Sequence, residues 1–239
     1  MRKYIKKKMV KERNKMKNEK NKKMPETNIP EPTVRRMPSY LSHLKILKSK
    51  GEMYVSAPQI AKNLNLEATQ VTKDLSYTKI VGKTRVGYEI SELITVLSEF
   101  LGFHQIKDAF LVGAGNLGEA LIKYEGFKDF GLKIVAAFDI NEKIVGKKIV
   151  GVDILHLDEF RNLAEKMNVV LGIITTPASE AQSVADLMVG WGIKAIWNFS
   201  PTTIKVPEGV IVQNTSIYSN LAVIFNKLNN QFLQQEQTI

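Results

Sequence analysis

The chain has 239 residues, of which 44% are hydrophobic and 24% charged, with 34 Lys and Arg against 24 Asp and Glu. That length suits one large domain or two modest ones, and the apolar fraction excludes a collagen-like or wholly disordered protein. No apolar run approaches the roughly 20 residues of a membrane helix, and cysteine is absent. We therefore expect a cytoplasmic protein without a membrane segment, secretory signal, disulfide or metal site.

The N-terminal residues 1–33 are rich in Lys and Asn and lack apolar periodicity. Residues 1–24 hold 12 Lys and Arg and two Glu, so they carry the whole net charge of +10. Such a segment cannot bury enough apolar surface to offset its ordering entropy, and we predict a disordered tail. It is either a solubilising tail or a non-specific arm attracted to phosphates.

Residues 34–106 follow the pattern of a winged-helix domain. Apolar residues recur at helical spacing over 37–47, and Ser56 stands three residues before Gln59, a capping-box arrangement that starts a short helix. A second helix is expected over 68–76. Together these segments predict a helix followed by a helix–turn–helix.

A hairpin and a closing helix complete the predicted domain. Residues 79–90 alternate loosely around two glycines, which predicts a two-stranded hairpin, and a helix is expected over 91–101. In a winged helix the second helix of the pair enters the major groove, and the hairpin touches the backbone or the minor groove. Short helical trios also serve as dimerisation or lid domains, which is the alternative. The side chains expected to contact DNA are Thr69, Gln70, Thr72, Lys73, Ser76, Lys79, Lys83 and Arg85.

A dinucleotide-binding motif begins after residue 108. The apolar run 109–112 predicts a buried parallel strand, Gly-Ala-Gly-Asn-Leu-Gly follows at 113–118, and a helix is expected over 119–124. In G-x-G-x-x-G the first glycine permits a tight turn and the second lets the backbone approach a pyrophosphate. The third allows the helix to pack closely on the strand. The phosphates would lie on the helix N-terminus.

An acid follows the next strand. The strand over 133–138 ends in Asp139, 21 residues beyond Gly118. A carboxylate there accepts hydrogen bonds from an adenosine ribose and repels a 2′-phosphate, which predicts NAD(H) rather than NADP(H).

Alternating strands and helices continue to residue 214, with strands over 169–175, 195–199 and 210–212 and a helix over 179–189. Because ligands lie beyond the carboxyl ends of strands in open α/β sheets, residues at these ends are candidates too, although ordinary turn chemistry explains them equally well. The cofactor-binding residues expected from this pattern are Gly113, Ala114, Gly115, Asn116, Leu117, Gly118, Asp139, Thr175, Pro177 and Asn198.

The sequence favours sensing over catalysis. A dehydrogenase needs an acid–base group beside the nicotinamide, but His43 and His104 precede the nucleotide domain. His156 lies before a predicted helix, where a structural role is expected. The nucleotide domain fills 107–214 and leaves no separate substrate domain, so we predict no catalytic residues.

The C-terminal segment, 215–239, predicts an amphipathic helix. Its apolar positions are Ile217, Leu221, Ile224, Leu228 and Phe232. Such a stripe needs an apolar surface, either the chain's own sheet or a partner subunit. A symmetric dimer is also what a helix–turn–helix reader of palindromic DNA requires.

Eight short motifs occur in order, with few gaps, over about residues 35–230. They are QVTKDLSY at 70–77, VGY at 86–88, VGAGNLG at 112–118, AAFD at 136–139, TTP at 175–177, GIK at 192–194, NFSP at 198–201 and VPEGV at 206–210. In this arrangement they resemble the Rex family of bacterial redox-sensing repressors.

The resemblance implies an α/β protein with an N-terminal winged helix-turn-helix domain, a Rossmann-type parallel sheet for NAD(H) and a domain-swapped C-terminal helix. It implies a homodimer that binds double-stranded operator DNA when NADH is scarce and releases it when NADH rises. By position, residues 113–118 and Asp139 would bind the cofactor. Tyr124 matches the family's tyrosine after the glycine loop, which takes part in the switch, and the resemblance adds it to the expected cofactor-binding residues.

The chain departs from the family pattern in both functional parts. In the DNA-binding part, Thr72 replaces an arginine, Thr78 and Lys79 replace Phe-Gly, and Thr84 and Arg85 replace the wing's Arg-Gly. Ser42 and Ser216 stand where the family has an Arg–Asp ion pair that relays the redox state. One alternative is therefore a Rex-like NAD(H)-binding protein with lost or altered operator recognition. A small NAD-dependent oxidoreductase is the other.

Overall fold

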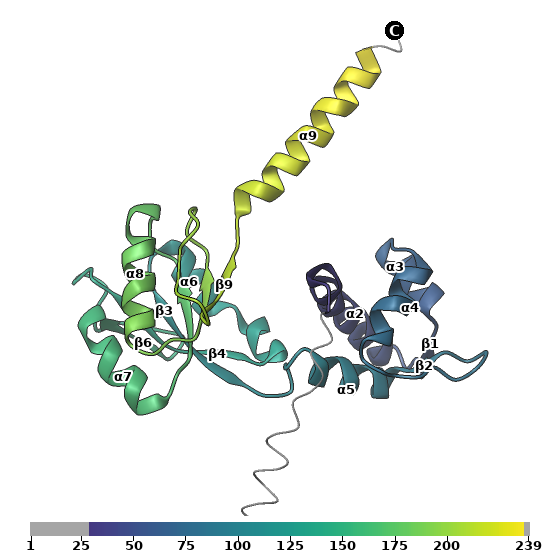
Figure 1. Cartoon of the computed structure of the whole chain (residues 1–239), viewed down its shortest axis with the longest axis horizontal. Coiled ribbons are helices and arrows are strands. Elements are labelled where there is room, and N and C mark those ends of the chain that lie inside the picture. Colours follow the sequence, from purple (N-terminus) through teal and green to yellow (C-terminus); the bar gives the residue numbers. More distant parts are fainter. Residues whose placement is uncertain (1–28, 237–239) are drawn as a thin grey trace, which may run out of the picture. The chain divides into compact units, whose positions relative to one another are not determined.

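The structure is a computed structural model that describes residues 29–236 (Figure 1). The chain forms two compact units, divided after Leu97. The predicted tail up to residue 28 lies outside the described residues.

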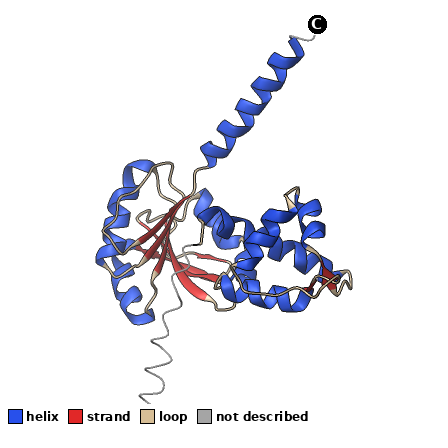
Figure 2. Cartoon of the chain, turned by 45° about the vertical axis from the view of Figure 1, so that its right-hand side comes forward, coloured by secondary structure: helices blue, strands red, loops and turns tan. Residues whose placement is uncertain are grey.

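The first unit combines helices with a two-stranded sheet, drawn in blue and red in Figure 2. Its elements are α2 (Glu31–Ser49), β1 (Tyr54–Val55), α3 (Ala57–Leu64), α4 (Ala68–Ser76), β2 (Tyr88–Glu89) and α5 (Ile90–Phe100). Helix α3 starts with the predicted capping box, in which Ser56 and Gln59 each accept a hydrogen bond from the other's backbone amide. The unit's core includes Met37, Tyr40, Leu41, Leu44, Ile60, Val71, Leu75, Leu93 and Leu97.

Helix α2 begins earlier than predicted and takes in residues 31–33, which we had assigned to the tail. Pro32 suits the first helical turn because that turn needs no backbone N–H from it. Thr33, in the same turn, is buried. Tertiary packing therefore orders these three residues.

The hairpin predicted over 79–90 is wrong in its pairing. Strand β2 pairs antiparallel with β1, which precedes α3, and the arms of the predicted hairpin are joined by a single bridge between Lys83 and Gly87. Lys79 has a left-handed φ of 63°, so the first arm cannot begin as an extended strand. The second arm finds its partner in β1 instead.

The second unit holds a seven-stranded sheet in the order β5-β6-β4-β3-β7-β8-β9. The strands are β3 (Lys107–Val112), β4 (Leu132–Asp139), β5 (Lys148–Ile149), β6 (Val152–His156), β7 (Leu171–Ile174), β8 (Ala195–Asn198) and β9 (Ile211–Asn214). Neighbours are parallel except for β5 and β6. The order reverses between β3 and β7, the switch point at which doubly wound sheets bind ligands. The predicted Rossmann-type sheet is confirmed.

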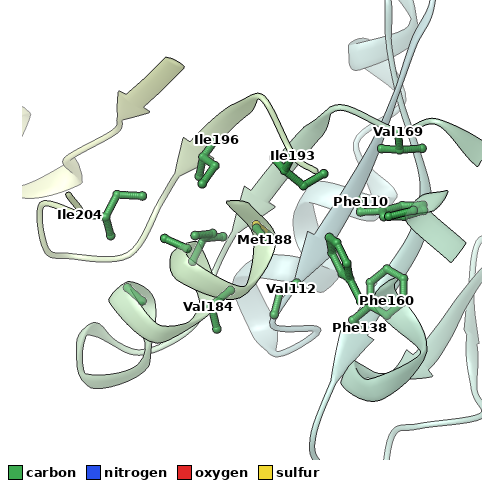
Figure 3. Packing of buried hydrophobic residues seen from close by; sticks show 14 of the residues in the cluster. Phe110, Val112, Phe138, Phe160, Val169, Val184, Met188, Ile193, Ile196 and Ile204 are labelled. Atoms are coloured by element: carbon green, nitrogen blue, oxygen red, sulfur yellow. The ribbon is translucent and has the colours of Figure 1, made fainter. Parts of the chain in front are cut away.

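Helices cover both faces of this sheet. They are α6 (Asn116–Lys123), α7 (Phe160–Met167) and α8 (Ala178–Gly190). Two short 3₁₀ segments, η1 (Glu125–Phe130) and η2 (Leu157–Glu159), lie between the strands in sequence. A last helix, α9 (Ile217–Glu236), follows the last strand. Alternate residues of β3 face opposite cores: Phe110 packs with α7 and α8, and Leu111 packs with α6. Figure 3 shows Phe110, Phe138 and Phe160 grouped in the first core, with ring centroids 4.8–5.2 Å apart.

The division after Leu97 precedes the boundary expected at 106. The segment that follows belongs to the second unit by packing, since Phe103 contacts the ring of Phe130 at a centroid distance of 5.4 Å. A Cβ added to Gly131 would lie 2.7 Å from the carbonyl oxygen of Gln105. Composition carries no signal for such contacts, so the boundary was not visible in the sequence.

Candidate functional site

The glycine loop joins β3 to α6 at the switch point of the sheet. Gly113 has φ +101°, and a Cβ there would lie 2.9 Å from the carbonyl carbon of Thr175. A Cβ on Gly118 would lie 2.1 Å from the carbonyl oxygen of Gly113. Both positions therefore require glycine for the fold itself.

Gly115 differs from these two glycines. A Cβ placed on it would meet no atom of the described chain within 4 Å, and its φ of −71° is open to any residue. Gly115 is the N-cap of α6, and no described side chain caps that helix. Space beside an uncapped helix N-terminus fits a pyrophosphate, which binds backbone N–H groups and the positive end of the helix dipole.

Asp139 ends β4 and is tied to the glycine loop. Its Oδ2 accepts a hydrogen bond from the backbone N–H of Ala114 at 2.8 Å, and its Oδ1 accepts one from that of Asn141 at 2.9 Å. A carboxylate has about four lone-pair sites, so each oxygen keeps capacity for a ribose hydroxyl. The acid therefore lies directly beside the glycine loop.

Thr175 supports the glycine loop from β7. Its Oγ1 donates to the carbonyl oxygen of Gly113 at 2.6 Å. The adjacent Thr176 was missed by sequence reasoning: within the described residues its hydroxyl is buried and has no hydrogen-bond partner. Pro177 is the exposed N-cap of α8. Thr175 and Thr176 thus border the loop from the opposite side of the switch point.

Asn198 is fully buried at the end of β8. Its Nδ2 donates to the carbonyl oxygen of Thr202 at 2.7 Å and to Oδ1 of Asn214 at 2.8 Å. Its Oδ1 accepts from the backbone N–H of Ser200 at 3.0 Å. Both amide hydrogens and the oxygen are engaged, so this side chain orders the loop beyond β8. This arrangement fits the alternative of ordinary turn chemistry rather than cofactor binding.

Tyr124 lies at the other end of α6 from the glycine loop. An eight-residue helix rises about 12 Å, so the structure does not bring this ring to the phosphate position. The side chain is 57% exposed and packs edge-on against Phe127 at 4.9 Å. It borders a cavity of about 240 Å³ that Lys133 and Val150 also line.

Helix α4 presents most of the predicted DNA-contacting side chains to solvent. Thr69, Thr72, Lys73 and Ser76 are exposed, and Gln70 is half-buried beside the Arg36 guanidinium. The hydroxyl of Thr72 donates to the carbonyl oxygen of Ala68 at 3.0 Å, and that of Ser76 to the carbonyl oxygen of Lys73 at 2.7 Å. Both hydroxyls can still accept hydrogen bonds.

A buried carboxylate attaches α4 to α2. Asp74 is 1% exposed, and its two oxygens accept hydrogen bonds from three residues of α2. The donors are Thr33 Oγ1 at 2.9 Å, Arg36 Nε and an Arg36 terminal nitrogen at 2.7 and 2.8 Å, and the Tyr40 hydroxyl at 2.6 Å. Sequence reasoning missed this cluster. Its signal was an acid between Val71 and Leu75 on the apolar face of α4.

The groups of this cluster shift one another's pKa values. Burial acts to raise the pKa of the Asp74 carboxyl, but the hydrogen bonds from Arg36, Tyr40 and Thr33 outweigh burial and the pKa is lowered. Burial, then the hydrogen bond to Asp74, raises the pKa of Tyr40 to about 12. At neutral pH the carboxylate and guanidinium are therefore ionised and the phenol is neutral.

The wing, residues 79–87, carries the remaining cations. Lys79, Lys83 and Arg85 are exposed, and Arg85 adopts a left-handed φ of 63° at the tip. The wing therefore presents three positive charges in one short loop.

Helix α9 leaves its apolar side chains unburied. Residues 218–231 are all exposed, including Leu221, Ile224 and Leu228 of the predicted stripe. The side chains of Ile217 and Phe232 lie outside the described residues. Ser216, which replaces an expected aspartate, accepts a hydrogen bond from the Ser219 backbone N–H at 3.2 Å, as an N-cap does.

Other candidate chemistry is limited in the described part of the chain. No helix there is long and apolar enough to cross a membrane, and no three His, Asp or Glu side chains gather where they could hold a metal ion. His156 pairs with Asp158 at 3.1 Å and accepts from its backbone N–H, a local capping role.

The chain is similar to known proteins along most of its length. Residues 28–76 match a family model described as "Putative DNA-binding protein N-terminus", and residues 104–202 match one described as "CoA binding domain". The Redox-sensing transcriptional repressor Rex of Bacteroides fragilis is 53% identical over 203 residues, covering 85% of this chain and 92% of that protein. The repressor of the same name from Porphyromonas gingivalis is 47% identical, covering 86% and 94%.

Solved structures agree with these relatives. The crystal structure of RSP, a Rex-family repressor, in complex with β-NAD⁺ and operator DNA matches with a TM-score of 0.81 and 30% identity. The match covers 88% of this chain and 97% of that one. The same repressor in complex with β-NADH matches with a TM-score of 0.79 and 31% identity.

Proposed function

Because the chain belongs to the Rex family of redox-sensing transcriptional repressors, we propose that it binds operator DNA and releases it when NADH binds. The observation that carries the proposal is a glycine loop with open space at Gly115, at the switch point of a parallel sheet. The same chain presents exposed polar and cationic side chains on α4 and the wing. A ligand can control DNA binding directly when both parts lie on one polypeptide.

The proposed ligand of the second unit is NAD(H). Backbone groups of residues 113–118 would hold the pyrophosphate, and Asp139 would accept hydrogen bonds from an unphosphorylated adenosine ribose. CoA is the ligand in the name of the matched family model. Like NADP(H), CoA carries a phosphate on its ribose, and the Asp139 carboxylate would repel it. The bound dinucleotide supplies a redox signal, since its reduced and oxidised forms differ in charge and shape at the nicotinamide.

DNA contacts are proposed for both α4 and the wing. Exposed side chains of α4 would read the major groove, and the wing lysines and arginine would bind phosphates or the minor groove. The exposed apolar side chains of α9 support a homodimer, because a helix with an unburied apolar stripe needs a second surface. On the strength of the family resemblance, we propose that this surface is the partner subunit, in a domain-swapped arrangement.

No catalysis is proposed. Asp139 and His156 are neighbours in the β4–β6 ladder, on the adenosine side of the sheet, and His156 is engaged by Asp158. A hydride transfer would need an acid or base on the nicotinamide side.

The proposed location is the cytoplasm, because a repressor of chromosomal genes would work there.

The release of DNA by NADH is the central prediction. NADH is expected to weaken binding to a duplex enriched from a randomised pool by about 5- to 150-fold, the range of ordinary allosteric coupling. Fluorescence anisotropy at fixed salt, with NAD⁺ and then NADH, measures it. Equal affinity with both nucleotides would show a DNA-binding protein whose sensor is uncoupled, and absence of any duplex binding would favour the alternative without operator recognition.

Ligand choice gives a second prediction. NADPH and CoA are expected to bind at least about tenfold more weakly than NADH, because each places a phosphate near Asp139. Isothermal titration calorimetry with each ligand in turn checks it. In an Asp139→Ser variant NADPH should bind more tightly and NADH more weakly. Equal affinities of the wild type for NADH, NADPH and CoA would contradict the role assigned to Asp139.

A further inference from the structure

The wing is anchored at its base by contacts within the first unit. A Cβ on Gly87 would lie 2.4 Å from the carbonyl oxygen of Val55, so the wing backbone rests directly on β1. Lys83 and Gly87 exchange two backbone hydrogen bonds, of 2.8 and 2.9 Å. The ring of Tyr88 covers Gly82, whose added Cβ would lie 3.3 Å away. These contacts hold the backbone at Lys83 before any DNA is bound.

The side chain of Lys83 is also held. Its Nζ donates to the Tyr54 hydroxyl at 3.3 Å and lies 5.1 Å from the centroid of the Tyr54 ring. That geometry combines a hydrogen bond with a cation–π contact. Tyr54 belongs to β1, directly before Val55 and the Ser56 cap of α3, so it connects the wing charge to the helix–turn–helix.

We propose that Tyr54 is a positioning residue that holds the Lys83 ammonium ready to bind a DNA phosphate. The inference rests on the proposed function and deepens it by naming how the wing takes part. An ammonium has three donors, so one hydrogen bond to Tyr54 leaves two for phosphate oxygens. A free lysine loses rotamer entropy when it is ordered, and a lysine already held by Tyr54 avoids part of that loss on binding.

A double-mutant cycle tests the proposal on the full-length protein. Lys83→Ala is expected to lower affinity for the enriched duplex and to reduce the slope of log K against log salt by about one phosphate contact. Tyr54→Ala should lower affinity by about 2- to 5-fold, the strength of an exposed cation–π contact, with little change in slope. Tyr54→Phe, which keeps the ring, should fall between wild type and Tyr54→Ala. In the Lys83→Ala background, Tyr54→Ala should have no further effect.

Controls separate positioning from folding. Lys166→Ala removes an equal charge from α7 in the second unit and should leave the slope nearly unchanged. Thermal melting checks that each variant is folded. A loss from Tyr54→Ala that is as large without Lys83 as with it would overturn the proposal and assign Tyr54 a purely structural role. If the wild type binds duplex DNA and Lys83→Ala binds it equally well, the proposal for Tyr54 and Lys83 is wrong but the proposed function stands. A wild type that binds no duplex overturns the proposed function as well.

Discussion

Replacing Gly115 by alanine is expected to weaken NADH binding by about 10- to 150-fold, while the protein stays folded. A Cβ at this position meets no atom of the described chain within 4 Å, so the fold tolerates it. It would occupy the space through which a pyrophosphate reaches the amides at the start of α6. Losing one or more hydrogen bonds to a charged group costs about 1.5–3 kcal/mol, which corresponds to this range. Titration of NADH fluorescence measures the affinity.

Gly118→Ala is the matched control for Gly115→Ala. Its Cβ would lie 2.1 Å from the Gly113 carbonyl oxygen, so it must displace backbone at the contact of α6 with β3. We therefore expect this variant to lower the melting temperature strongly, whereas Gly115→Ala should cost only about 0.5–1 kcal/mol, because alanine is a poorer N-cap than glycine. NADH affinity at the wild-type level in a folded Gly115→Ala protein would remove the glycine loop from the site.

Replacing Asp74 by alanine is expected to destabilise the first unit by about 3 kcal/mol. Removing one partner of a buried ion pair costs about 3–5 kcal/mol, because the other charge is left uncompensated. The Arg36 side chain keeps 24% exposure, which places the expected cost at the lower end of that range. Urea unfolding monitored by circular dichroism measures the change. Tyr40→Phe, which removes one donor to the charged carboxylate and keeps the ring, should cost about 1.5–3 kcal/mol.

The pH dependence of unfolding checks the same cluster. The pKa of Asp74 is lowered in the folded protein. Its stabilisation is therefore fully present above the ordinary aspartate pKa of about 3.9 and is lost as pH falls through the lowered folded-state pKa. The gap in stability between wild type and Asp74→Ala should shrink over that acidic window. A gap that stayed constant down to the acid limit would show that the carboxylate's charge contributes nothing.

Local patterns were sufficient for the part of the second unit around the glycine loop. The glycine loop, the strand before it and the acid at the end of β4 are consecutive in the chain, and each has a local physical requirement, so their spacing identified the fold and the candidate cofactor site. The same holds for α3 and α4, because the capping box of α3 and the apolar positions of both helices lie within one or two turns of each other. Similarly, the apolar stripe of α9 was readable because it follows a single helix.

The tertiary structure decided what depends on residues far apart in the chain. Strand β2 pairs with β1 across two helices instead of with its own hairpin arm, because the left-handed Lys79 interrupts that arm. Asp74 is buried because three donors of α2, 34 to 41 residues earlier in the sequence, converge on it. The side-chain amide of Asn198 is fully hydrogen-bonded within the fold, to Thr202, Asn214 and Ser200. The sequence by itself determined which elements form and what the glycine loop can bind, since those follow from neighbouring residues. Whether a polar side chain faces a ligand or another part of the fold was decided by long-range packing, which local periodicity does not encode.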